Sequence, residues 1–114
     1  MVIKIYHNPR CRKSREGLKF LQEQGHEFQV IDYIKNGISI LEINEIILKL
    51  HVSPKNLIRT NEALYKNELK NLNLKDEEWI TIITENPQLL IRPIVLAKHK
   101  GVIANPPENI LKLV

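Results

Sequence analysis

The first third of the chain switches between two hydrophobic periodicities, and this switch is the strongest constraint on the fold. Residues 2–6 and 27–33 have the apolar pattern of short strands. Between them, residues 11–24 place apolar side chains at helical spacing, and Gly25 follows where a helix is expected to stop. A crossover helix normally joins parallel strands of one sheet, so the sequence predicts an α/β fold.

The rest of the chain predicts a helical segment, a hairpin and a last helix. The expected elements are helices at 39–50 and 76–85, helical turns at 54–58 and 61–69, strands at 94–97 and 102–104, and a terminal helix from 106. Ser39 is expected to cap the first of these helices, and Leu41 is expected to face inward from it. In the terminal helix, Leu111 is expected to pack against the core.

At 114 residues the chain is expected to form one domain, residues 1–114. Without residues 38–86, the order of elements is strand, helix, strand, strand, strand, helix. That is the order of a thioredoxin-like domain with a mixed four-stranded sheet. The sequence therefore predicts a thioredoxin-like core at about 1–37 and 87–114, with a helical insertion between the second and third strands.

Several classes of protein are excluded by composition. No apolar run approaches the roughly 18 residues that a membrane-spanning helix needs. The N-terminus enters the first strand pattern without the features of a signal peptide. A single cysteine cannot form an internal disulfide, which excludes a small secreted disulfide framework. We therefore expect a cytoplasmic monomer that does not contact a membrane.

The chain carries 17 Lys and Arg against 13 Asp and Glu, a net charge of +4. Most basic residues are spread along the chain, and no RNP, zinc-finger or basic-zipper pattern is present, so nucleic acid is not an expected partner. The one dense cluster of cations surrounds the only cysteine, Cys11, and consists of Arg10, Arg12, Lys13 and Arg15. Attraction of a small anion explains this cluster more economically.

Cys11 is predicted to be a reactive thiolate. A free thiol has a pKa of about 8.5 and is only a few per cent ionised at neutral pH. Cys11 lies where the first strand ends and the first helix begins, and a helix N-terminus favours an anion. Ser14, one turn along the same helix face, is the obvious hydrogen-bond donor, and His7 is a second candidate. Most lone cysteines simply pack as small apolar side chains, but four flanking cations favour the reactive interpretation.

The spacing around Cys11 excludes other cysteine chemistries. A cysteine-dependent phosphatase needs an arginine six residues after the nucleophile, where this chain has Gly17. A dithiol oxidoreductase needs a second cysteine at the position of Ser14, so an external thiol must complete any cycle that begins at Cys11. One cysteine and four scattered histidines show no metal-ligand spacing, and no metal is expected.

Four separated segments resemble the arsenate reductase family of the glutaredoxin-coupled type. The first surrounds the cysteine, Tyr6-His7-Asn8-Pro9-Arg10-Cys11-Arg12-Lys13-Ser14-Arg15. The others are Leu57-Ile58-Arg59-Thr60-Asn61 and Ile91-Arg92-Pro93-Ile94-Val95, and Pro106-Pro107-Glu108 matches the family's closing motif. The segments occur in the family's order over nearly the whole chain, so the resemblance is specific.

The resemblance implies a role for each matched residue. Cys11 would attack an arsenic oxyanion, and Arg59 and Arg92 would bind it. Pro93 would follow a cis peptide bond. His7 and Ser14 would tune the thiolate, and Asn8 would hold the loop. The family binds no cofactor: glutathione acts as co-substrate, and glutaredoxin or a similar thiol donor is the expected partner.

Asn105 is the one important departure from the family pattern, because it occupies the place of a third arginine. Losing a charged hydrogen bond costs on the order of 1.5–3 kcal/mol, so arsenate reduction is expected to be weakened. Two alternatives therefore stay open. One is a reductase of another thiol adduct, and the other is a regulator like the related Spx proteins, which bind RNA polymerase. Ser14 argues against the second alternative, because those relatives often sense oxidation through a Cys-x-x-Cys pair, which Ser14 removes.

Overall fold

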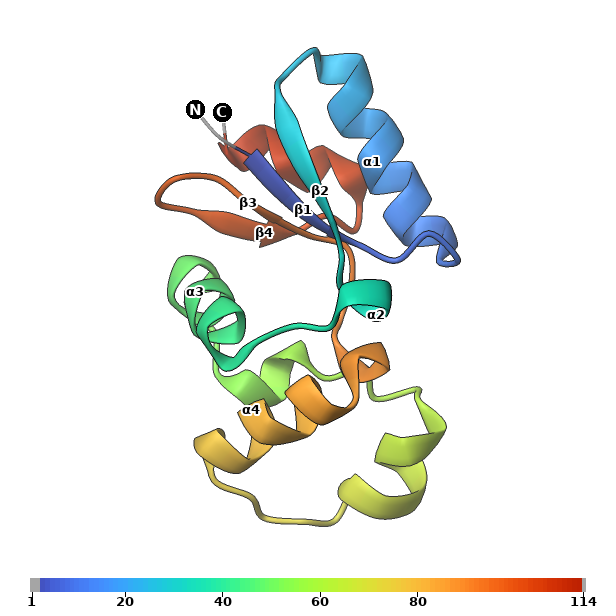
Figure 1. Cartoon of the computed structure of the whole chain (residues 1–114), viewed down its shortest axis with the longest axis vertical. Coiled ribbons are helices and arrows are strands. Elements are labelled where there is room, and N and C mark those ends of the chain that lie inside the picture. Colours follow the sequence, from blue (N-terminus) through green and yellow to red (C-terminus); the bar gives the residue numbers. More distant parts are fainter. Residues whose placement is uncertain (1–2, 114) are drawn as a thin grey trace. The chain divides into compact units, whose positions relative to one another are not determined.

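The computed structural model describes residues 3–113 (Figure 1), which fall into two compact units. The first unit contains the chain up to Asn36 together with the chain from Arg92 onward, and the second is Gly37–Ile91. The first unit carries the sheet, and the second is helical. Within residues 3–113, no helix is both long enough and apolar enough to cross a membrane.

The sheet of the first unit has four strands in the order β2-β1-β3-β4. The central strand β1 (Ile3–His7) pairs in parallel with β2 (Phe28–Asp32). On its other side β1 pairs antiparallel with β3 (Ile94–Leu96), which pairs antiparallel with β4 (Gly101–Ile103). The predicted mixed, four-stranded, thioredoxin-like sheet with its first two strands parallel is therefore confirmed.

One face of this sheet is covered by α1 (Arg12–Gln24) and by η4 (Pro107–Leu113), which also contact each other (Figure 1). The buried residues on this face form one apolar cluster of Ile3, Ile5, Leu21, Val95, Ala97, Ala104, Ile110 and Leu113. Side chains alternate between the faces of a strand, so the intervening positions of β1 and β3 point the other way. This core holds α1, and with it Cys11, against the sheet.

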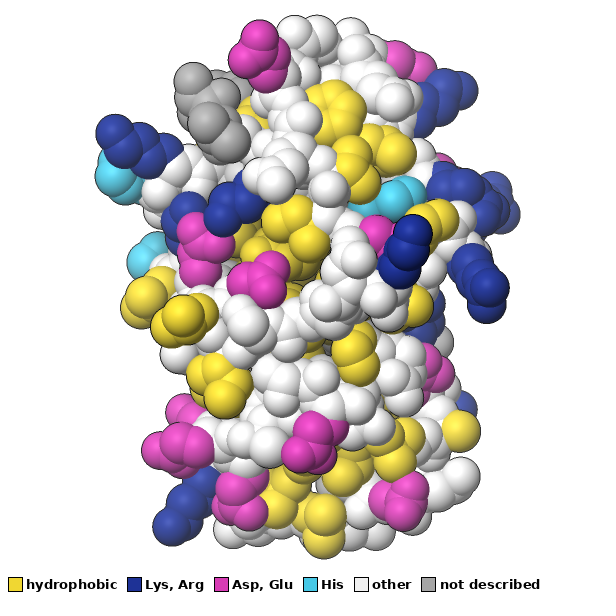
Figure 2. Space-filling view, viewed as in Figure 1, with side chains coloured by type: hydrophobic (Ala, Val, Ile, Leu, Met, Phe, Trp, Pro, Cys, Tyr) yellow, Lys and Arg dark blue, Asp and Glu magenta, His cyan; other side chains and the backbone are white. Residues whose placement is uncertain are grey.

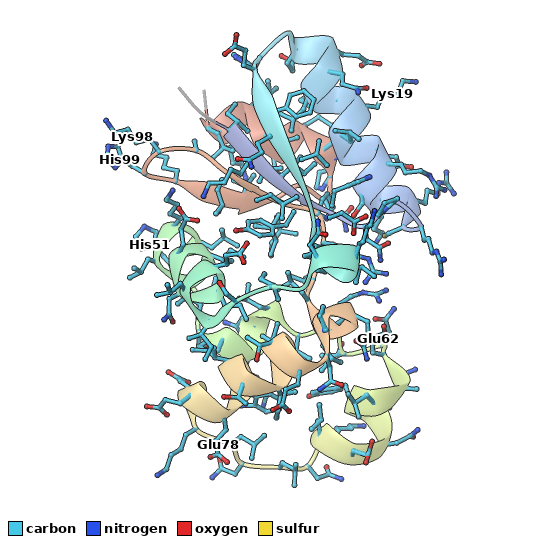
Figure 3. The ribbon with its side chains drawn as sticks, in the orientation of Figure 1. Lys19, His51, Glu62, Glu78, Lys98 and His99 are labelled. Atoms are coloured by element: carbon cyan, nitrogen blue, oxygen red, sulfur yellow. The ribbon has the colours of Figure 1, made fainter. Side chains whose placement is uncertain are left out.

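Four strand ends meet at one edge of the sheet. His7 at the end of β1 pairs with Asp32 at the end of β2. Ile94 at the start of β3 pairs with Tyr6 on one side and with Ile103, the last residue of β4, on the other. The segments that leave these four ends therefore share this edge. The turn between β3 and β4, with Lys98 and His99, lies at the opposite end (Figure 3).

Helix α1 approaches the start of β3 closely at Gly17. A Cβ atom at Gly17 would lie 2.8 Å from Cγ of Pro93, closer than real Cβ contacts allow. Pro93 also accepts a 2.9 Å hydrogen bond from the backbone N–H of Ala104. The Arg92–Pro93 peptide is cis, as the resemblance implied, and the Asn105–Pro106 peptide is also cis, which was not anticipated.

The second unit contains α3 (Ile40–Leu50) and α4 (Asp76–Glu85), linked and followed by shorter turns. These turns are η1 (Pro54–Leu57), η2 (Tyr65–Leu69) and η3 (Pro87–Leu89). Trp79 and Ile83 of α4 are buried with Leu57, Leu89 and Leu90. The predicted cap at Ser39 is confirmed by a reciprocal pair of bonds with Glu42, at 3.1 and 3.0 Å.

Three details of the sequence prediction are wrong. Leu41 is 80% exposed, because it lies on the side of α3 opposite Ile43 and Ile46. Leu111 is 47% exposed, since the last helix is a 3₁₀ helix and turns a different face inward. The second strand ends one residue earlier than expected, at Asp32. The carboxylate of Asp32 accepts the N–H of Lys35 at 3.0 Å and starts an unpredicted turn, α2 (Tyr33–Asn36).

The contact at Gly17 predicts an inverted response to a common stabilising substitution. Glycine to alanine inside a helix ordinarily stabilises by about 1 kcal/mol. Here Gly17→Ala is expected to destabilise the protein by about 1–3 kcal/mol, because the new methyl group overlaps Pro93. Urea unfolding followed by circular dichroism measures the change, with Lys19→Ala on the exposed face of α1 as control (Figure 3). A gain in stability for Gly17→Ala would contradict the contact.

Candidate active site

Cys11 is the N-cap residue of α1, at the end of a tight loop that begins after β1. Its backbone is extended, with φ of −94° and ψ of 124°, and its carbonyl accepts the first helical hydrogen bond from Arg15 at 3.0 Å. The Asn8 side chain accepts the backbone N–H of Arg10 at 3.0 Å, and its carbonyl accepts that of Cys11 at 3.0 Å. Asn8 therefore joins two positions of the loop by hydrogen bonds.

The Cys11 thiol is half-buried, and its pKa is lowered from the ordinary value to about 7. Burial alone raises the pKa, since it disfavours the thiolate. Burial is the largest single influence on this pKa, but four smaller ones together outweigh it: a hydrogen bond from the Ser14 backbone, the hydrogen bond and the charge of the Arg92 side chain, and a hydrogen bond from the Lys13 backbone. About half of the thiol is therefore ionised at neutral pH.

Arg92 reaches Cys11 from the other side of the sheet edge. It lies two residues before β3, which pairs with β1, and its guanidinium reaches the loop that leaves β1. It is the one arginine whose side chain both hydrogen-bonds the Cys11 sulfur and stabilises its charge, among the residues that the structure describes. Two of the residues predicted for the site, Cys11 and Arg92, are thus brought together.

Ser14 lies beside Cys11, but it acts through a different group from the one expected. Its side chain is fully buried, and the hydroxyl makes no hydrogen bond to any residue between 3 and 113. The backbone of Ser14, in the first turn of α1, supplies the hydrogen bond to the Cys11 sulfur. Within Ser14, the backbone at the helix N-terminus, rather than the hydroxyl, therefore helps to stabilise the thiolate.

His7 is 6% exposed at the end of β1. Burial lowers the pKa of its imidazole, and the Arg15 charge lowers it further, against the opposing effects of the Asp32 carboxylate and the Ser14 backbone. The ring is therefore neutral at pH 7. Asp32 is a member of this environment that the sequence prediction missed. The sequence could have indicated this, because Asp32 lies at the end of a predicted strand parallel to β1, and the carboxyl ends of parallel strands meet at one edge of the sheet.

The other two residues predicted for the site are Asn105 and Arg59. Asn105 is exposed and follows β4, at the same sheet edge as Arg92, since the preceding Ala104 bonds Pro93. Arg59 belongs to the second unit, where its guanidinium forms a 3.1 Å ion pair with Glu62, labelled in Figure 3.

The surroundings of Cys11 are cationic. Figure 2 shows Lys and Arg side chains gathered around the loop between β1 and α1. Between residues 3 and 113, no group of three or more His, Cys, Asp or Glu side chains is placed to hold a metal ion. The arrangement combines a nucleophile of lowered pKa, an arginine and the backbone N–H groups of a helix start, which suits attack on a small anion.

Comparison with known proteins gives consistent matches over nearly the whole chain. A sequence profile described as "ArsC family" matches residues 6–113. The chain is 41% identical to an arsenate reductase of Neisseria meningitidis over 110 residues, 95% of this chain and 94% of that protein. It is 40% identical to the uncharacterized protein YfgD of Escherichia coli over 114 residues, 98% of this chain and 96% of that one.

A solved structure, described as an arsenate reductase from Vibrio cholerae, has the same fold with a TM-score of 0.94. It shares 35% sequence identity, and the alignment covers 100% of this chain and 98% of that one.

The contact with Arg92 predicts a shift in the ionisation of Cys11. Arg92→Ala is expected to raise the Cys11 pKa from about 7 toward the ordinary value of about 8.5, because a hydrogen bond and a positive charge are lost together. The pH dependence of alkylation by iodoacetamide measures this, since only the thiolate reacts. Below its pKa the rate falls about tenfold per pH unit, so the variant reacts more slowly at pH 7.

Arg12→Ala is the matched control for this measurement. Arg12 is adjacent to Cys11, but its side chain is exposed and pairs with Glu16 at 3.1 Å. Its removal is expected to leave the midpoint near pH 7. A midpoint in Arg92→Ala that coincides with the control would contradict the assigned contact.

Proposed function

The chain belongs to the ArsC family, and from that premise we propose that it is a monothiol reductase whose Cys11 thiolate attacks an oxyanion such as arsenate. The observation that carries the proposal is the half-ionised Cys11 at a helix start beside Arg92. A neutral thiol is a poor nucleophile, so the lowered pKa is what this reaction requires.

The proposed cycle balances with two thiols. The Cys11 thiolate forms a sulfur–arsenic bond, and one arsenate oxygen leaves as water after protonation. A glutathione thiolate then attacks the Cys11 sulfur and forms a mixed disulfide, while the electron pair of the sulfur–arsenic bond stays on arsenic as arsenite. A second thiol, from glutaredoxin or a similar donor, attacks the disulfide and returns Cys11. The external donor is needed because Cys11 is the only cysteine.

The residues predicted for the site contribute to this proposal in different ways. The planar guanidinium of Arg92 can donate to the thiolate and to an oxygen of the incoming anion. The N–H groups at the start of α1 add donors for the same anion. Neutral His7 adds no positive charge of its own. The role of Arg59 rests on its place in a segment like that of the family, and Glu62 would have to release it.

The direct test is an assay of arsenate-dependent NADPH consumption, with glutathione, glutaredoxin and glutathione reductase supplied. Turnover is expected with the wild-type protein and not with Cys11→Ser, which keeps the size of the side chain but loses the nucleophile. Wild-type turnover no higher than that of Cys11→Ser would refute arsenate reduction. It would favour the alternative, reduction of another thiol adduct, such as a glutathionylated molecule. The neutral Asn105 is the observation that supports this alternative.

Restoring a charge at position 105 separates these two functions. Because Asn105 is exposed at the edge shared with Arg92, Asn105→Arg is expected to fold and to add a charged donor. The KM for arsenate is expected to fall by about tenfold or more, as a charge-assisted bond contributes about 1.5–3 kcal/mol. Asn105→Gln, an amide of similar length, is the control and is expected to leave KM unchanged. An equal KM in all three proteins would contradict oxyanion binding at this edge.

A further inference from the structure

A pocket of about 370 Å³ lies directly beside the Cys11 loop, within the range of volumes that bind small ligands. Its lining comes from two segments of the first unit, the loop and the turn after β2, and consists of Asn8, Pro9, Arg10, Asp32, Ile34 and Lys35. Because β1 lies between β2 and β3 in the sheet, this pocket and Arg92 flank the loop from its two sides. Arg92 is not among the residues that line the pocket.

The charges of the pocket are those of a site for an acidic peptide. Arg10 and Lys35 are exposed, and neither forms an ion pair with another residue in the range 3–113. Asp32 supplies one carboxylate, while Pro9 and Ile34 supply apolar contact area. By contrast, Arg12 on the same side of the molecule is paired with Glu16. Two unpaired cations and one anion complement a molecule with two carboxylates and one ammonium group.

We propose that this pocket binds the thiol that completes the cycle, a short acidic peptide thiol of the glutathione type. Arg10 and Lys35 hold its carboxylates, and Asp32 holds its ammonium group. The inference rests on the thiol step of the proposed function and adds the place from which that thiol reaches Cys11. It also gives Arg10 and Lys35 a specific binding role, beyond the general attraction of anions by the cations around Cys11.

The pocket can be tested by a reaction that needs no arsenate. The Cys11 thiolate attacks one sulfur of glutathione disulfide, the disulfide bond breaks, and a Cys11–glutathione disulfide forms. One glutathione leaves as a thiolate and takes a proton from water. The rate of the mass increase of the full-length protein is measured by mass spectrometry. Hydroxyethyl disulfide, which is neutral, is the matched reagent without carboxylates.

The expected result is a slower reaction of the pocket variant with the charged disulfide and an unchanged rate with the neutral one. The double variant Arg10→Gln, Lys35→Gln is expected to react about tenfold more slowly with glutathione disulfide, and at the wild-type rate with hydroxyethyl disulfide. Arg12→Gln removes a charge at the same distance along the chain from Cys11 as Arg10, but outside the pocket. It is expected to keep the wild-type rate with both reagents. Since all three side chains are exposed, the variants are expected to fold.

Two results would contradict the proposal that the pocket binds the thiol. One is an equal slowing by Arg12→Gln, which would reduce the effect to general attraction of anions. The other is an equal slowing of the double variant with the neutral disulfide, which would indicate a change in Cys11 itself.

Failure of the pocket and failure of the proposed function are distinguishable. Wild-type protein that does not reduce arsenate but retains the charge-dependent preference for glutathione disulfide refutes the function and supports the pocket. Arsenate turnover in which the double variant keeps the wild-type KM for glutathione supports the function and refutes the pocket.

Discussion

The contact of Gly17 with Pro93 is the constraint on which the reactive site depends. Helix α1 carries Cys11 at its first end, and the segment before β3 carries Arg92. The two segments can approach because no side chain stands between them at position 17. The pairing of β1 with β3 then sets how far along the edge Arg92 lies. Helix packing and strand register thus place the cation beside the sulfur.

The ionisation of Cys11 results from a balance between burial of the sulfur and the donors around it. Burial disfavours the thiolate and is the largest single influence on its pKa. Full exposure would weaken the donors, because water screens their charges. The half-buried position at an N-cap keeps backbone N–H groups and Arg92 effective while the sulfur stays reachable. The same geometry leaves His7 neutral, since its burial exceeds the influence of Asp32.

Local patterns in the sequence predicted the fold well, and contacts between distant segments were predicted poorly. The parallel first strands and the cap at Ser39 follow from periodicity and spacing, and both are confirmed. The exposed Leu41 was predicted wrongly. An apolar residue type alone does not show which side of a helix the residue occupies; its angular position around the helix axis is also needed. In the site, Cys11 was identified from its neighbours along the chain. The place of Asp32 beside His7 and the contact of Gly17 with Pro93 were not predicted. Each depends on packing between segments that are far apart in the sequence.

The buried hydroxyl of Ser14 has a consequence for how this chemistry could change over evolution. Position 14 is one helical turn from Cys11 and is closed to solvent, with no partner for its oxygen among residues 3–113. Exchanging that oxygen for sulfur would lose no hydrogen bond to a described residue. The new thiol would lie one helical turn from Cys11, at the spacing of a Cys-x-x-Cys pair. In the proposed reaction, a single exchanged atom would then allow a disulfide to form within the chain, where the present sequence needs an external thiol.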